Sequence, residues 1–322
     1  MGIKSVIKKI IIQRNGSKKK LNSEYLKKYD KYSFRGTNCT NVQQYEAVIT
    51  RLYHSIEKGL SYQNYRVGFG KANIEALLST LEKYSSEMKD YDVFFYRTAL
   101  STLFEYIKKN KEHGHFDENL EQRVKALPGN PNILGGIIKF EPLTEENVQK
   151  LNFNDFLKDR HSIRHFSGVP VDVEKLKAAV RLAQYTPSAC NRQGWRTRII
   201  ANKDLLNKVL SNQNGNTGFG QEIDKLLIVT TDIRYFNRDR ETYQAFIDGG
   251  MYAENLINAL HFYHIGSIPL SASLTKEQET NVRDFIGMDD AEVLILFIGV
   301  GSYPEQCQTT RSERRDAEIT VL

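Results

Sequence analysis

The sequence predicts an α+β protein: a mainly helical N-terminal region, residues 1–150, followed by a layered domain of helices around a β-sheet, residues 151–322. Three observations support this fold class. The 322 residues have an ordinary globular composition, with 40% hydrophobic and 26% charged residues. Apolar residues in the first half recur at helical spacing. The second half alternates helical patterns with short apolar runs that are typical of strands.

The N-terminal segment carries the excess of positive charge. Residues 1–60 hold 13 Lys and Arg against 4 Asp and Glu, while the whole chain has a net charge of +6. In IKSVIKKIII, near the start, apolar residues lie opposite lysines on a predicted helix. This helix can dock on its own protein, the interpretation we favour, or make a peripheral contact with an anionic membrane through residues 1–20. No nucleic-acid partner is expected, because the basic residues match no known binding module.

Two amphipathic helices are expected in the rest of the N-terminal region. Apolar residues recur every three or four positions within residues 71–84, and again between Leu100 and Ile107. Residues 113–143 lose this periodicity and contain several Pro and Gly, which indicates a connector or covering loop. We therefore place the domain boundary near 145–152.

Helices and strands alternate irregularly in the second half, which favours a layered sheet domain without internal repeats. Its helical patterns lie at residues 172–185, 203–210, 242–264 and 275–286, and its strand patterns at 195–201, 226–230 and 292–299. The longest apolar run, VLILFIGV at 293–300, is shorter than the roughly 18 residues of a membrane span and predicts a buried strand.

Familiar catalytic and metal-binding signatures are missing. The sequence has no GxSxG, HExxH or GxxxxGK[ST] motif, and Cys39, Cys190 and Cys307 are too widely spaced to indicate a disulfide framework or a zinc site. The N-terminus also lacks the features of a secretory signal, so a cytoplasmic location is expected.

Two stretches have compositions suited to a ligand. The first, DRHSIRHF at 159–166, places Arg160, Ser162 and Arg164 on one side of an extended segment, with His161 between them. Guanidinium groups and a hydroxyl in this pattern suit a phosphate. The alternative is a solvated charged loop before a helix.

The second stretch is TPSACNRQGWRTRII at 186–200. Pro187 is expected to end the preceding helix, and Ser188 and Ala189 are small enough for a flat ligand to approach the backbone. The side chain of Asn191 offers an amide, which can both donate and accept hydrogen bonds at a heteroaromatic edge. The alternative is a polar turn in which Trp195 fills the core.

Together, RHSIR at 160–164 and PSACNRQGW about 25 residues later resemble the paired signature of the nitroreductase family. The resemblance continues in the family's order through 155–322. Residues 247–267 resemble its long central helix, 294–305 its late core strand, and 311–322 its basic C-terminal segment and final strand. The resemblance implies a mixed β-sheet flanked by helices, and an intertwined homodimer with two FMN molecules at the interface.

The resemblance also assigns expected FMN contacts. Arg160, Ser162 and Arg164 match the phosphate and ribityl positions, and His161 matches a position that touches the flavin tail. Residues that match ring-lining positions are Ser188, Ala189 and Asn191, with Pro187 and Ser188 reaching the ring from the partner subunit. Backbone contacts to the ring are expected within Pro269, Leu270 and Ser271, and either Arg311 or Arg314 is expected at the phosphate.

The implied activity is hydride transfer from NADH or NADPH through the flavin to a small organic acceptor, in a ping-pong scheme. The flavin carries the chemistry, so no acid, base or nucleophile motif is required. One departure is Gly194, where the family often has Pro, and this is expected to loosen the turn.

The segment 53–78 in the N-terminal half resembles an extension of nitroreductase-like proteins associated with polysaccharide biosynthesis. An alternative function is therefore a flavoprotein that acts mainly as a membrane-associated partner in such an assembly. His54, Glu57 and Lys58 in this segment are candidate functional residues, or else cap and salt-bridge a helix.

Overall fold

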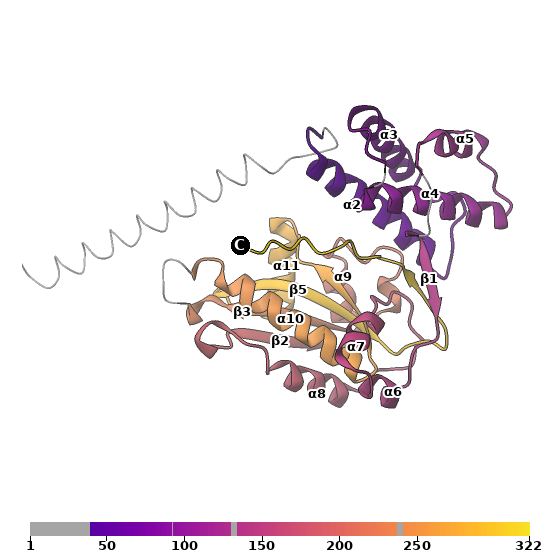
Figure 1. The fold of residues 1–322 in the computed structure, drawn as a ribbon. Coiled ribbons are helices and arrows are strands. Elements are labelled where there is room, and N and C mark those ends of the chain that lie inside the picture. Colours follow the sequence, from indigo (N-terminus) through magenta and orange to yellow (C-terminus); the bar gives the residue numbers. More distant parts are fainter. Residues whose placement is uncertain (1–38, 92, 130–133, 237–240) are drawn as a thin grey trace, which may run out of the picture. The chain divides into compact units, whose positions relative to one another are not determined.

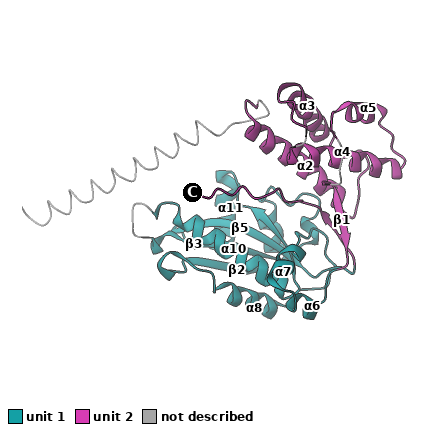
Figure 2. Cartoon of the chain, viewed as in Figure 1, with its two compact units in different colours: residues 1–33, 142–305 teal, residues 34–141, 306–322 magenta. Residues whose placement is uncertain are grey.

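The computed structural model describes residues 39–91, 93–129, 134–236 and 241–322 (Figure 1). The predicted helix and membrane contact at residues 1–20 lie outside them. The described chain forms two compact units (Figure 2): unit 1 comprises residues 142–305, and unit 2 comprises 39–141 together with 306–322. The sequence-based division near residue 150 keeps residues 306–322 with the second half, whereas their contacts group them with the first.

Unit 1 is built on a four-stranded antiparallel sheet. Its strands, in spatial order, are β2 (Trp195–Ile200), β3 (Lys225–Asp232), β5 (Glu292–Gly301) and β4 (Gly266–Ser271). All eight residues of β3 are buried, which fits the apolar run at its centre, residues 226–229, and its position inside the sheet. The two edges of the sheet are therefore β2 and β4.

Helices pack around this sheet. They are α6 (Glu145–Gln149), α7 (Phe153–Asp159), α8 (Val173–Ala183), α9 (Lys203–Leu210), α10 (Gln244–Phe262) and α11 (Lys276–Ile286). Helix α10 crosses the sheet and contacts all four strands and α8. Its Tyr252 stacks on Trp195 of β2, with 4.8 Å between ring centroids. The α+β fold class is thus confirmed.

Unit 2 is mainly helical, as expected for the N-terminal region. It contains α2 (Val42–Ser61), α3 (Lys71–Glu87), α4 (Phe94–Glu112), α5 (Glu118–Ala126) and a two-stranded antiparallel sheet of β1 (Ile137–Phe140) and β6 (Cys307–Thr310). Apolar faces of its helices form a separate core in which Tyr45, Leu81 and Tyr96 are fully buried. No helix in the described part of the chain is long and apolar enough to cross a membrane.

Two sequence-based expectations are wrong. Residues 113–143 are not only a connector, because they contain α5, which Asp117 caps by accepting the Leu120 N–H, and β1, whose partner β6 is remote in sequence. The expected final strand within 311–322 is not formed: β6 ends at Thr310 and the following residues are irregular. Ile319 and Leu322 in this tail are exposed, so no strand in the described part of the chain covers them.

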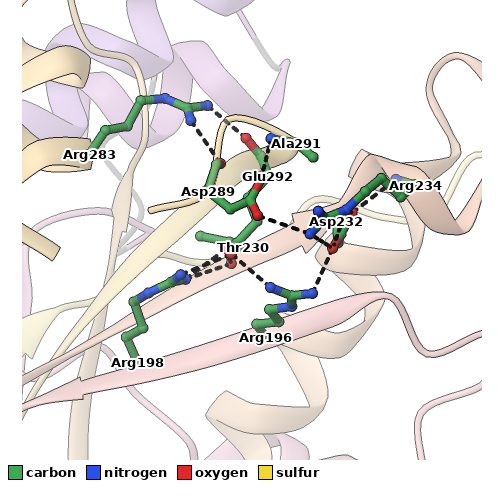
Figure 3. A network of polar contacts seen from close by, with 9 residues as sticks. All are labelled: Arg196, Arg198, Thr230, Asp232, Arg234, Arg283, Asp289, Ala291 and Glu292. Atoms are coloured by element: carbon green, nitrogen blue, oxygen red, sulfur yellow. Dashed lines mark hydrogen bonds and ion pairs between the residues drawn. The ribbon is translucent and has the colours of Figure 1, made fainter. Parts of the chain in front are cut away.

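A network of arginines and carboxylates ties together the ends of β2, β3 and β5 (Figure 3). Asp232 and Glu292 are each 1% exposed. Arg198 binds both carboxylate oxygens of Glu292 at 2.7 and 2.9 Å, and Arg196 bridges Glu292 at 3.0 Å and Asp232 at 2.6 Å. Arg234 adds a third guanidinium, bound to Asp232. The buried negative charges are thus fully compensated.

These partners hold Glu292 in its ionised form. Burial by itself raises the pKa of Glu292, but hydrogen bonds from Arg198 and Thr230, with the charges of Arg198 and Arg196, outweigh burial and lower the pKa to about 2. Because the folded pKa is below the ordinary value of about 4.3, ionised Glu292 stabilises the fold at neutral pH. This stabilisation is lost as the pH falls from the ordinary pKa through about 2.

We predict that Glu292→Gln lowers the free energy of unfolding at pH 7 by about 3 kcal/mol, because it leaves Arg198 without its carboxylate partner and Arg196 with Asp232 alone. The variant should also lose less stability than the wild type between pH 5 and pH 3. Urea unfolding at several pH values measures both effects. The exposed Glu305→Gln serves as the control, and a Glu292→Gln variant as stable as this control would contradict the prediction.

Candidate functional site

The segment 160–164 is anchored beside the edge strand β4. Helix α7 ends at Asp159, and the chain continues in an extended conformation. Ser162 forms a parallel bridge with Ser267 of β4, and the Ile163 N–H donates to the Ser267 carbonyl at 2.9 Å. The Ile163 side chain is buried, at 2% exposure. These contacts fix the segment to the sheet rather than leaving it as a solvated loop.

The positive groups of this segment are partly withdrawn from solvent. Arg164 is buried, at 7% exposure, and Arg160 and His161 are half-buried. The neighbouring His165 contacts the Glu222 carboxylate through Nδ1 at 2.5 Å. Guanidinium groups match a phosphate in charge and in hydrogen-bond geometry, so the composition of this segment suits a phosphate group.

Pro269, Leu270 and Ser271 lie on the same edge of the sheet. Strand β4 pairs only with β5 among the described strands, and proline is tolerated on such an edge strand because no ladder needs its missing N–H. Gln213 Nε2 donates to the Ser271 carbonyl at 3.0 Å and fixes the end of the strand. The structure therefore brings 160–164 and 269–271, two of the predicted contact segments, together.

The loop before β2 has a strained backbone. Cys190, Asn191 and Gln193 all have positive φ, at 52°, 56° and 50°. A left-handed conformation costs a residue with a side chain about 1 kcal/mol. The Gln193 N–H donates to Ser188 Oγ at 3.0 Å, and the Asn191 N–H to the Ser188 carbonyl at 2.9 Å. Strain of this kind, held by specific hydrogen bonds, is common where a backbone is shaped for a ligand.

A buried carboxylate supports this loop from α10. Asp248 is 1% exposed, and its Oδ2 accepts the Ala189 N–H at 3.2 Å. Gln244, one turn earlier, donates to Asp248 Oδ1 at 2.7 Å. Sequence reasoning did not identify Asp248. The available signal was an aspartate between apolar residues near the start of the helix, but the N–H that it accepts, that of Ala189, is remote in sequence.

An ion pair clamps the other side of the loop. Arg192 binds both oxygens of Glu241, at 2.7 and 3.1 Å, and its guanidinium lies over the Phe236 ring. Arg192 Nε also donates to the Ala189 carbonyl at 2.8 Å. This clamp, which the sequence pattern did not reveal, ties the loop to the chain between β3 and α10.

Gly194 does not loosen the turn. It is buried, its carbonyl accepts the Asp232 N–H at 2.8 Å, and a Cβ added here would lie 3.2 Å from Tyr235 Cβ. The core role of Trp195 is confirmed: it is 5% exposed, and its Nε1 donates to Gln184 at 3.0 Å.

Strand register separates the two motifs within one chain. Trp195 of β2 lies opposite Thr231, which lies opposite Val293, whereas Ser267 of β4 lies opposite Val300 at the other end of β5. At about 3.3 Å per residue along a strand and about 4.8 Å between strands, these anchor points are roughly 25 Å apart. A single chain thus does not place 187–191 beside 160–164.

Arg311 and Arg314 belong to unit 2. The Arg311 N–H donates to the Gly136 carbonyl at 3.1 Å, just beyond the end of β6. The expected contact of one of these arginines with a phosphate stays a prediction.

Comparison with known proteins finds similarity to a known family in the segment that contains both motifs. The family model described as "Nitroreductase family" matches residues 157–217. Iodotyrosine deiodinase 1 of Rattus norvegicus is 26% identical over 105 residues, which are 33% of this chain and 36% of that protein. Chloronitrobenzene nitroreductase of Comamonas testosteroni is 38% identical over 47 residues, 15% of this chain and 21% of that protein. The chain thus spans about a third of the length of the first relative and about a fifth of the length of the second.

Among solved structures, an FMN-dependent nitroreductase from Clostridium difficile aligns with a TM-score of 0.41 at 18% identity. This alignment covers 51% of this chain and 90% of that one. The motifs RHSIR and PSACNRQGW both fall inside the segment that the family model matches. Residues 157–217 are therefore the part of this chain that is similar to the nitroreductase family.

Proposed function

We propose that this protein is an FMN-dependent oxidoreductase, in which a hydride from NADH or NADPH passes through the flavin to a small organic acceptor. The observation that carries the proposal is the single family match that spans both RHSIR and PSACNRQGW. Each motif also has a defined, anchored conformation in the structure, one beside β4 and one before β2.

The residues present fit FMN. Arg160 and the buried Arg164 supply positive charge for a phosphate, and Ser162 supplies a hydroxyl between them. The strained loop presents the Asn191 amide and a backbone held at Ala189 by Asp248, as a flat heteroaromatic ring requires. When bound, the flavin would accept and donate the hydride, and the protein would orient it and exclude water.

In this proposal the polar residues of the loop, together with Asp248, hold the loop backbone in position for the flavin ring. Asp248 fixes the Ala189 N–H, and Ser188 Oγ accepts the Gln193 N–H, so the ring-facing backbone is set before a ligand arrives. Gln193 Nε2 donates to Asn191 Oδ1 at 3.0 Å, which orients that amide so that its N–H groups can donate to the ring edge. Preorganised donors of this kind stabilise developing negative charge at little reorganisation cost.

We further propose that the active form is a homodimer and that each site is shared between two subunits. The separation of roughly 25 Å between the motif anchors in one chain supports this arrangement. An exposed apolar face on α10 supports it too: Tyr243, Phe246, Ile247 and Met251 recur every three or four residues and are 38 to 52% exposed. A second copy packed on this face would complete the site.

The proposed cofactor and electron donor can be tested directly. The purified protein should retain added FMN, and anaerobic NADH or NADPH should bleach the flavin absorbance until an organic acceptor restores it. Asn191→Gly keeps the positive φ without strain but removes the amide, so it should weaken FMN binding about tenfold. Asn154→Ala, exposed on α7, is the control. Failure of the wild type to retain FMN would refute the proposal.

The proposed dimer interface on α10 can be tested by substitution. Phe246→Asp places a charge on the apolar face of α10 and should shift the protein toward monomers in sedimentation velocity, with a parallel loss of bound FMN. Phe116→Asp is the matched control, because Phe116 is 68% exposed but lies in unit 2. A Phe246→Asp variant that remains dimeric would show that this face is not the interface.

A further inference from the structure

Unit 2 contains a cavity that the flavin proposal does not use. It has a volume of about 270 Å³ and lies between the start of α3, the second half of α4, and α5. Its lining mixes polar and apolar residues, and the apolar part, called its apolar floor below, consists of Ile74, Tyr106, Ile107 and Leu120. Ligand pockets commonly measure about 300–1,000 Å³, and this cavity lies just below the lower limit, so it suits only a small ligand.

The cavity wall is rigid, and its buried polar groups are already satisfied. Asn110, at 3% exposure, accepts the Gly68 N–H at 2.7 Å and donates to the Tyr106 carbonyl at 2.9 Å. The Tyr106 hydroxyl donates to the Phe69 carbonyl at 2.8 Å. A preformed wall of this kind lowers the ordering cost of binding.

Charged groups of both signs lie at the rim, and protein partners compensate most of them. The Glu75 carboxylate is bound by Arg123 at 2.8 Å, and Asp117 caps the N-terminus of α5. Lys111 is paired with Glu121 at 2.6 Å. The two acidic groups in the lining are thus each committed to a protein partner and do not oppose an anion strongly.

Lys71 is a cationic lining residue whose side chain has no partner among the described residues. It lines the cavity at the first position of α3, is exposed, and makes no ion pair or hydrogen bond through its side chain with the described residues. Helix α3 also begins without a side-chain cap or an acidic residue in its first turn. The helix start adds partial positive charge to that of Lys71 and so selects the sign of the ligand charge.

We propose that this cavity binds a small organic anion, with an apolar body over Ile74 and Ile107 and an anionic head group at Lys71. The cavity and its apolar floor carry the inference, and the charges at its mouth define the head group. The site lies wholly within unit 2 and is independent of the flavin proposal.

Isothermal titration of the full-length protein with 3-phenylpropionate tests the proposal. Binding is expected with a dissociation constant below about 1 mM. The neutral analogue 3-phenylpropanol should bind at least tenfold more weakly, because it lacks the charge. Inorganic phosphate should also bind at least tenfold more weakly, because it has no apolar body. Equal binding of the neutral analogue or of phosphate, or no binding of 3-phenylpropionate, would overturn the proposal.

Variants locate the binding. Lys71→Ala and Lys71→Glu change an exposed side chain and should weaken 3-phenylpropionate binding at least tenfold. Lys83→Ala, on the same helix but outside the cavity, should bind as the wild type does. FMN content should be unchanged in all three variants, which separates this site from the proposed flavin site. Undiminished binding in both Lys71 variants would overturn the proposal.

Discussion

The antiparallel register of β2, β3, β5 and β4 is the constraint on which the candidate site depends. Strand spacing and rise per residue are fixed by backbone hydrogen bonding, so a side chain can change rotamer but cannot cross the sheet. The register puts the anchor of RHSIR beside Ser267 and the anchor of PSACNRQGW at Trp195, at opposite corners. In the proposed function, a ligand that touches both motifs is therefore shared between two copies of the sheet.

The corner at β2 is also where unit 1 concentrates its buried charge. Asp248 and the Arg192–Glu241 pair hold the strained loop, and the arginines around Glu292 and Asp232 hold the strand ends beneath it (Figure 3). Strained backbone persists only where surrounding contacts over-determine it. These polar groups, rather than the apolar core, thus set the shape of the loop that would face a flavin.

Sequence patterns predicted the helices and strands whose formation depends mainly on residues close in sequence. Helical periodicity identified α8, α10 and α11, and apolar runs identified β3 and β5. That RHSIR and PSACNRQGW form one site follows only from the family resemblance and stays a prediction. The missed features depend on distant partners. Strand β1 exists because β6 pairs with it, and Asp248 matters because Ala189, far from it in sequence, donates to it. No window of sequence contains both members of these pairs.

The most direct test of a shared site is complementation between two defective subunits. Arg160→Ala removes a proposed phosphate contact and Asn191→Gly a proposed ring contact, so each homodimer should retain little FMN. In a shared site, a mixed dimer regains one intact site of two, and co-expression should restore about a quarter of wild-type FMN content. If the mixture retains no more FMN than the separate variants, the site is not built from two subunits.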